Sequence, residues 1–179
     1  MRMGCGFHTL RVAVLSSVVV LGGCLPRLPA RETAASPQMR PEIFFAGRSE
    51  GRGSLALRGR EPRAFRVTST GTSAPDGSFR LEQTVAFDDG EVNRRTWRIR
   101  PVDDRTYTGT LSDAAGEMHG TIDGNVFHLR YLVRQPAVYM EQRLYLQDDR
   151  RTVENQAEVT ILGIPWARLE ERIIRREAD

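Results

Sequence analysis

From residue 43 onward, apolar side chains tend to occupy every second position, and turn signals return at intervals of about 8 to 12 residues. Phe79, Leu81, Val85 and Phe87 illustrate the pattern, because polar or charged residues separate them and an Asp-Asp-Gly turn follows. We therefore predict an all-β domain. Successive hairpins with polar outer faces favour an antiparallel up-and-down barrel of about eight or nine strands, whose closure removes exposed sheet edges.

The expected strands lie around residues 55–57, 65–67, 79–87, 96–100, 106–111, 118–122, 127–133, 138–146 and 153–161. The period then changes. Trp166, Leu169 and Ile173 follow Pro165 at helical spacing, which predicts a short C-terminal helix. We expect this helix to pack on the barrel exterior or over one opening.

The first 23 residues are typical of a cleaved secretory signal. Arg2 and Arg11 precede an uncharged stretch at residues 12–23. Twelve helical residues span roughly 18 Å, which is too short for the roughly 30 Å hydrocarbon core of a bilayer. A basic head followed by a short apolar core and small residues indicates a signal peptide.

The residues Leu21-Gly22-Gly23-Cys24 resemble the bacterial lipobox. We predict that Cys24 becomes the acylated N-terminus, with diacylglycerol on its sulfur and a fatty acid such as palmitate on its amine. Several acyl chains anchor a protein firmly, whereas a single chain binds only marginally. The alternative is an ordinary signal peptide with a chance cysteine. Cys5 lies in the part that would be removed, so no disulfide is expected.

Residues 24–42 are rich in proline, which breaks helices and central strands. We predict a flexible tether there and a barrel domain at residues 43–179. The expected location is the bacterial cell envelope, lipid-anchored and facing the periplasm. Leu25 follows the cysteine, and the absence of Asp at that position favours the outer membrane over the inner one.

The charge argues against a nucleic-acid partner. All 26 basic residues are arginine, and they face 23 acidic residues, for a formal net charge of +3. Without Arg2 and Arg11 the balance is nearly neutral. A near-neutral domain does not provide the basic surface that phosphate backbones require.

No residue pattern points to a catalytic, metal or cofactor site. His119 and His128 fall on outward positions, and no His/Cys cluster has metal-binding spacing. The pairs at residues 88–89 and 148–149 are interpreted as surface turns, not as a carboxylate dyad or a Ca²⁺ site. The glycines at 47, 51 and 53 are interpreted as turn glycines, since no helix follows to form a phosphate loop.

Polar side chains interrupt the apolar stripes of four predicted strands: Gln83, Arg95, Gln142 and Asn155. A buried polar group without a partner costs about 1–3 kcal/mol. These side chains either satisfy one another and ordered water or line a cavity and bind a ligand's head group. Arg95 is the most informative, because an isolated buried guanidinium is costly and its fork matches a carboxylate or phosphate.

The segments DDGEVNRRTWRI and YTGTLSDAAGEMHGTIDGN, a tyrosine-bearing strand and a final Leu-Gly-Ile-Pro resemble an uncharacterised family of bacterial lipocalin-like lipoproteins. The resemblance covers about residues 43–175 and includes Gly90, Arg95, Trp97, Tyr107, Gly109, Gly120, Gly124, Asn125 and Tyr131. It implies a calycin-type barrel, with no established activity and no catalytic residues. Members of that family often lie in gene neighbourhoods with fatty-acid-modifying enzymes, which suggests lipid handling by association.

The leading hypothesis is a membrane-anchored periplasmic barrel that binds a fatty acid, lipid or other apolar small molecule. The candidate ligand-binding residues are Gln83, Arg95, Trp97, Tyr131, Gln142 and Asn155. One alternative is a non-enzymatic envelope interaction or maintenance module with a filled core. Another is a lipid-modifying isomerase or cyclase, which convergence of Tyr107, Tyr131 and Arg95 on one cavity would favour.

Overall fold

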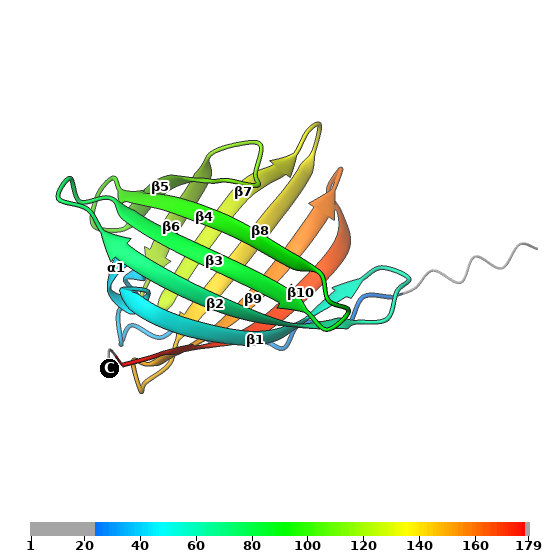
Figure 1. Cartoon of the computed structure of the whole chain (residues 1–179), viewed down its shortest axis with the longest axis horizontal. Helices are drawn as coiled ribbons and strands as arrows, with labels where there is room; N and C mark the ends of the chain where they lie inside the picture. The colour runs from blue at the N-terminus through cyan, green and yellow to red at the C-terminus, as the bar shows by residue number, and fades with distance from the viewer. Residues whose placement is uncertain (1–23, 178–179) are drawn as a thin grey trace, which may run out of the picture.

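The computed structural model describes residues 24–177, which form a closed antiparallel β-barrel of ten strands (Figure 1). Each strand pairs with the next along the chain, and β1 pairs with β10 to close the sheet. The elements are α1 Pro41–Phe44, β1 Gly47–Leu57, β2 Arg63–Ser73, β3 Phe79–Phe87, β4 Val92–Pro101, β5 Thr106–Leu111, β6 Met118–Asp123, β7 Val126–Arg134, β8 Val138–Leu146, β9 Thr152–Ile161 and β10 Ile164–Arg175. The predicted up-and-down barrel is thus confirmed, with one or two strands more than expected.

The predicted C-terminal helix is wrong, because that segment is strand β10. Ala167, Leu169, Glu171 and Ile173 face the interior in alternation, opposite inward residues of β9. A register shift between Pro165 and Ala167 displaces the pattern at the start of the strand. The carboxylate of Glu171 then interrupts the row of inward apolar residues. The apolar residues that remain visible, Trp166, Leu169 and Ile173, are spaced as they would be on a helix.

The glycines of β1 are not turn glycines as predicted. Gly51 and Gly53 lie on the inner face of the strand, opposite Ile173 and Glu171 of β10. A side chain on Gly51 would overlap the Glu171 carboxylate, and one on Gly53 would overlap the ring of Phe65. These glycines therefore provide the space in which Glu171 is buried.

The two ends of the barrel differ. The end that carries α1, called the cap end, is closed by Met39, Phe44 and Phe45, which are all buried. The opposite end, called the mouth end, is formed by the β1–β2, β3–β4, β5–β6, β7–β8 and β9–β10 turns (Figure 1). Residues 43–46, which we had assigned to the barrel, form part of the cap.

Residues 24–40, here called the strap, contact the outer surface of the barrel and so differ from the expected free tether. The contacts near its start are hydrogen bonds from Arg168 Nη1 to Pro26 O, 2.7 Å, and from Gln156 Nε2 to Pro29 O, 2.8 Å. Further along, Ala34 N donates to Asn125 Oδ1 at 2.8 Å. The strap thus runs from the mouth end, along β10 and β9, to the β6–β7 turn at the cap end.

The hydrophobic core fills the cap half of the barrel. Its members include Phe79, Ile99, Phe127, Leu144 and Val153, each buried. The mouth half is also apolar inside, but several of its inner residues stay half-buried: Leu55, Phe87, Val133, Met140, Val159 and Leu169. A band of polar side chains separates the two halves.

Candidate ligand site inside the barrel

The polar band consists of Gln83, Arg95, Gln142, Asn155 and Glu171, here called the polar layer. These residues come from β3, β4, β8, β9 and β10, and all line one internal cavity of about 40 Å³. The first four lie on the inner face as their positions in the sequence predicted. Sequence reasoning missed Glu171 because it placed that residue on a helix.

Gln83 organises one side of the polar layer. Its Oε1 accepts hydrogen bonds from Trp97 Nε1 at 2.7 Å and from Arg95 Nε at 3.0 Å. Its Nε2 donates to Ser69 Oγ at 3.1 Å. Arg95 is held by this bond and lies 5.7 Å from the centroid of the Trp97 ring. Its two terminal nitrogens have no hydrogen-bond partner among residues 24–177, so they can bind an added acceptor.

Asn155 organises the other side. Its Nδ2 donates to Glu171 Oε2 at 3.1 Å and lies 3.5 Å from Gln142 Oε1. Gln142 Nε2 in turn donates to the Tyr131 hydroxyl at 3.0 Å. The Oδ1 atom of Asn155 is buried and finds no donor in the described part of the chain. A hydroxyl or other donor on a ligand would satisfy it.

The electrostatics of the layer leave one uncompensated cation. Burial raises the pKa of the Glu171 carboxyl, and the hydrogen bond from Asn155 and the charge of Arg95 oppose that shift. Burial likewise raises the pKa of Tyr131. Both shifts act in favour of the neutral form, and within the described residues no ion pair joins Arg95 to Glu171. A raised pKa lessens the repulsion that a carboxyl lining the same cavity would exert on an anionic head group at Arg95.

The aromatic candidate residues lie in two different parts of the barrel. Trp97 lines the cavity and meets Tyr131 edge to face, with ring centroids 5.3 Å apart. Tyr107 lies at the cap end, where its hydroxyl contacts Glu42 and Arg40. Tyr107, Tyr131 and Arg95 therefore do not converge on one cavity, so the arrangement that would have favoured a lipid-modifying enzyme is not found.

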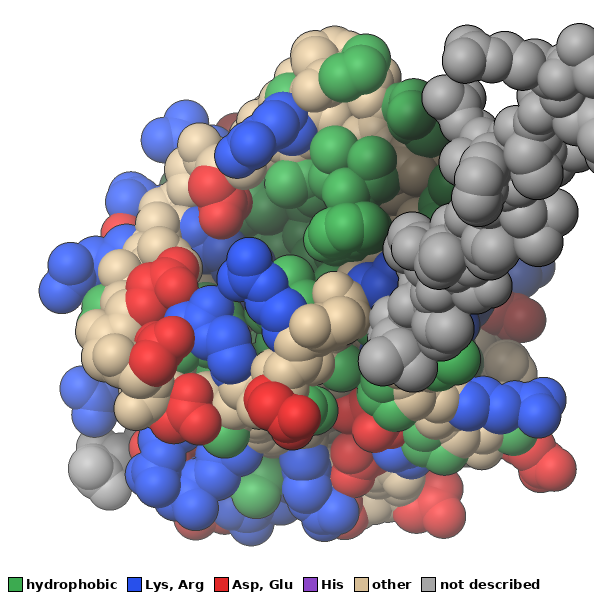
Figure 2. Space-filling model, turned by 90° about the vertical axis from the view of Figure 1, so that its right-hand side faces the viewer, with side chains coloured by type: hydrophobic (Ala, Val, Ile, Leu, Met, Phe, Trp, Pro, Cys, Tyr) green, Lys and Arg blue, Asp and Glu red, His purple; other side chains and the backbone are tan. Residues whose placement is uncertain are grey.

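The mouth end is hollowed and apolar. Figure 2 looks directly at this end and shows hydrophobic side chains gathered in a hollow, with arginines and acidic side chains around it. Several inner apolar residues of the mouth half are half-buried. On β4, Arg95 lies two residues closer to the mouth than Trp97. The interior thus runs from an apolar opening to a polar layer, and the internal cavity lies on the cap side of that layer, among core residues such as Leu81, Ile99 and Leu144.

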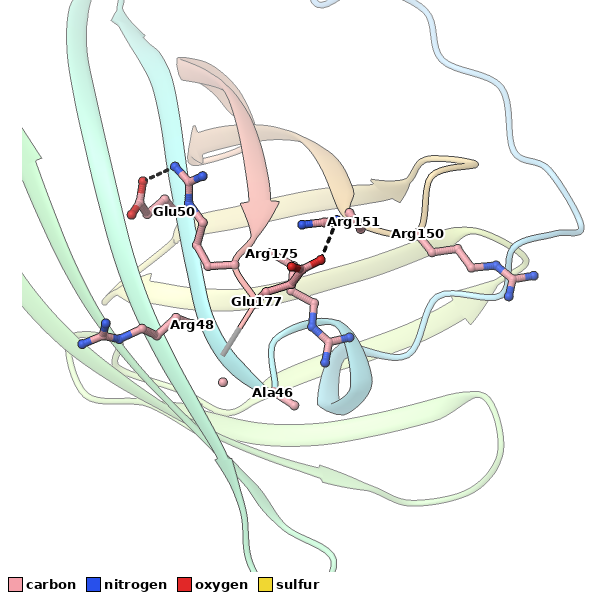
Figure 3. Close-up of a pocket in the computed structure, with 9 residues that line it drawn as sticks. Ala46, Arg48, Glu50, Arg150, Arg151, Arg175 and Glu177 are labelled. Atoms are coloured by element: carbon pink, nitrogen blue, oxygen red, sulfur yellow. Dashed lines mark hydrogen bonds and ion pairs between the residues drawn. The ribbon is translucent and has the colours of Figure 1, made fainter. Parts of the chain in front are cut away.

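A second hollow, of about 1100 Å³, lies at the cap end (Figure 3). It is lined by Ala46, Gly47, Arg48, Glu50, Arg150, Arg151, Arg175, Arg176 and Glu177. Arg176 pairs with Glu50 at 2.6 Å, and Arg151 pairs with Glu177 at 2.8 Å. The hollow is open to solvent, where water and salt screen charges, so its arginines do not by themselves indicate an anion site.

Other kinds of site find no support within the described residues. No group of three or more His, Cys, Asp or Glu side chains among residues 24–177 could hold a metal ion. His128 lies on the outer surface of β7, 3.0 Å from Glu141. In the same part of the chain, no helix has the length and apolar character needed to cross a bilayer.

A closed antiparallel barrel with a capped end, an apolar mouth and polar side chains inside is a lipocalin-like architecture. The chain belongs to the family described as protein of unknown function (DUF3833), which matches residues 18–175. No curated protein matches the sequence.

Solved structures with the same fold share little sequence with this chain. The S-type phycobiliprotein lyase CPES from Guillardia theta has a TM-score of 0.61 and 13% identity, over 79% of this chain and 95% of that one. Rv2717c from M. tuberculosis has a TM-score of 0.58 and 13% identity, over 78% and 99%. A DUF3598 protein of unknown function from Nostoc punctiforme has a TM-score of 0.58 and 14% identity, over 79% of this chain and 51% of that one. At this identity the likeness concerns the fold alone.

Proposed function

We propose that the barrel binds one amphipathic lipid with an acidic head group, a fatty acid being the simplest example. The head group lies at Arg95 in the polar layer, and the apolar chain lies in the mouth half. The observation that carries this proposal is the unpartnered end of the Arg95 guanidinium in a layer that also contains one unsatisfied acceptor, Asn155 Oδ1. A guanidinium fork binds a carboxylate or phosphate through two parallel hydrogen bonds.

The size of the internal cavity limits what part of the ligand it holds. At about 40 Å³, the cavity admits roughly three water-sized groups, since each needs about 10–15 Å³. That space suits a carboxylate but not an acyl chain. The apolar residues that line the cavity, such as Leu81, Ile99 and Leu144, lie on the cap side of the polar layer. The proposal therefore places the acyl chain on the other side of Arg95, past Leu169 and Met140, where inner apolar side chains are half-buried.

The second part of the proposal is that acylated Cys24 anchors the protein to the bacterial envelope, facing the periplasm. The sequence Leu21-Gly22-Gly23-Cys24 supports this. Cys24 is also exposed, as its modification requires. We favour the outer membrane because Leu25, and not Asp, follows the cysteine. Electrophoretic detection of a radiolabelled acyl chain, lost in Cys24→Ser, tests the anchor separately from ligand binding.

Native mass spectrometry tests ligand binding. The full chain, purified in a mild detergent, is incubated with a total membrane lipid extract. We expect a discrete added mass, with affinity roughly 10- to 150-fold weaker in Arg95→Ala, because a charge-assisted hydrogen bond contributes about 1.5–3 kcal/mol. Arg98→Ala is the matched control, since Arg98 lies on the same strand but faces outward and is exposed. Equal binding by both variants would refute the assignment of Arg95.

A second function is favoured by one observation, the small volume of the cavity. Ligand pockets usually measure about 300–1,000 Å³, whereas this cavity measures about 40 Å³. A filled barrel would act through its surface, as an envelope interaction or maintenance module. A bare protein mass at every lipid concentration would support this function and exclude the lipid carrier.

A further inference from the structure

The β9–β10 hairpin ends in an apolar tip at the mouth end. Leu162, Ile164 and Trp166 are 71%, 56% and 44% exposed, and are here called the tip. Leu162 and Gly163 form its two-residue turn, with φ angles of 51° and 79°. Turns with positive φ at both positions favour Asn and Gly, and Leu is strained there. Leu162 thus combines backbone strain with apolar exposure, a combination that points to a contact outside the barrel.

Two neighbouring turns hold the tip in place. Leu162 N donates to Ala137 O in the β7–β8 turn at 3.0 Å. On the other side, Arg58 N in the β1–β2 turn donates to Trp166 O at 2.9 Å. The apolar side chains are therefore presented by an ordered hairpin that belongs to the closed barrel.

The charges around the mouth are unevenly distributed. The β7–β8 turn carries Arg134 and no acid, and the β1–β2 turn carries Arg58 and Arg60 with Glu61. Among the turns of this end, the other acidic residues lie on the β3–β4 and β5–β6 turns, across the mouth: Asp88, Asp89, Glu91, Asp113 and Glu117. Below the tip, Glu158 of β9 is paired with Arg168 at 2.8 Å. The tip is therefore apolar and flanked by arginines, while the acidic turns lie on the opposite side.

The strap brings the proposed anchor to the same side. Pro26 O accepts a hydrogen bond from Arg168 Nη1 at 2.7 Å. Arg168 lies two residues beyond Trp166 on β10, and Cys24 lies two residues before Pro26. At no more than about 3.6 Å per residue, Cys24 stays within roughly 20 Å of the tip.

We propose that the tip docks on the membrane that holds Cys24, with its three apolar side chains in the bilayer interface. The flanking arginines then contact anionic phospholipid head groups, and the mouth opens towards the bilayer. Trp is favoured at this depth of a membrane, and long Arg side chains reach its phosphates. This inference rests on the proposed anchor but does not require the barrel to bind a ligand.

Tryptophan fluorescence tests the docking, because the chain has two tryptophans and Trp97 is buried in the barrel. The full chain is reconstituted in phosphatidylethanolamine–phosphatidylglycerol vesicles, with or without bromine on the acyl chains. Bromine on the acyl chains quenches only tryptophans that are close to it. We therefore expect it to quench Trp166 and to remove roughly half of the total tryptophan emission. In an Arg95→Ala background, which removes the proposed lipid site next to Trp97, Trp166→Phe should be insensitive to bromine. Unquenched wild-type protein, or equal quenching of the variant, would overturn the proposal.

Leu162→Asn separates docking from stability. Asn suits the turn, so the variant should unfold at the same or a higher temperature while its bromine quenching falls at least roughly twofold. Val102→Asn is the matched control, since Val102 is 61% exposed but lies beyond β4 at the cap end. The proposal fails if Leu162→Asn keeps full quenching or if Val102→Asn loses as much.

Two further results distinguish the possible causes of failure. A stable dimer in detergent that protects Trp166 would assign the tip to a second copy of the chain and overturn membrane docking. Bromine quenching without any lipid adduct in the mass spectrometer would refute the proposed ligand binding alone. An adduct without quenching would refute the docking alone.

Discussion

Replacing Glu171 by glutamine keeps the shape of the side chain but removes an ionisable carboxyl from inside the barrel. Glu171 is 7% exposed, and within the polar layer its Oε2 accepts a hydrogen bond from Asn155 Nδ2. Burial raises its pKa in the folded protein. The unfolded chain therefore releases this proton at a lower pH than the native barrel does. The contribution of Glu171 to stability is fully present below the unfolded-state pKa and is lost as pH rises through the folded-state pKa.

The size of the effect follows from proton linkage. One proton retained by the native state and released by the unfolded chain changes the free energy of unfolding by at most about 1.4 kcal/mol per pH unit. We expect the wild-type protein to lose stability towards alkaline pH with a slope below this limit. Glu171→Gln should lack that part of the slope. The variant should be more stable than the wild type at pH 8, by an amount that shrinks as the pH falls to 5.

Urea unfolding followed by circular dichroism between pH 5 and 9 measures the slopes. Glu170→Gln is the matched control, because Glu170 is the preceding residue of β10, faces outward and is exposed. It should leave the slope unchanged. The argument is refuted if wild type and Glu171→Gln lose stability in parallel, since Glu171 would then titrate in the barrel as it does in the unfolded chain.

Two other substitutions test the interior and the strap. Gly51→Ala should lower the free energy of unfolding by about 1–3 kcal/mol, because its methyl group would overlap the Glu171 carboxylate. The loss should shrink in a Glu171→Ala background, and equal losses in both backgrounds would contradict the packing. Asn125→Ala removes the bonds to Ala34 N and Leu146 O, at a cost of about 1–3 kcal/mol. Trypsin should then cleave the strap at Arg31 faster than in the wild type, and an unchanged cleavage rate would show that Asn125 does not hold the strap.

The barrel and most of its polar layer could be predicted from alternation alone. Gln83 stands in step with Leu81 and Val85, so a strand that buries those two must also turn Gln83 inward. The same reasoning placed Asn155 between Val153 and Ala157. Alternation along a strand determines which face a side chain is on, without any knowledge of the partner strand. These positions could therefore be predicted from the sequence alone.

The inward position of Glu171 and the contacts of the strap could not be predicted from the sequence, for different reasons. In β10, alternation is visible in Ala167, Leu169 and Ile173 once the glutamate between them is accepted as an inward residue. A buried carboxylate is rare enough that the pattern favoured a helix instead. The strap binds through the backbone carbonyls of Pro26 and Pro29. Such contacts leave no pattern in side-chain polarity, so proline-rich sequence alone suggested a tether.

The buried carboxyl is a second argument for the proposed ligand, after the unpartnered end of Arg95. Gly51 and Gly53 weaken the interior of a strand, because glycine loses more conformational entropy on folding than other residues. Their absent side chains make room for Glu171 and Phe65. Apolar residues of similar volume would stabilise the barrel as well or better than buried polar groups do. A sequence selected for a filled core alone has no need of this arrangement, whereas Arg95 and a carboxyl whose pKa is raised, lining one cavity, suit the anionic head group of the proposed ligand.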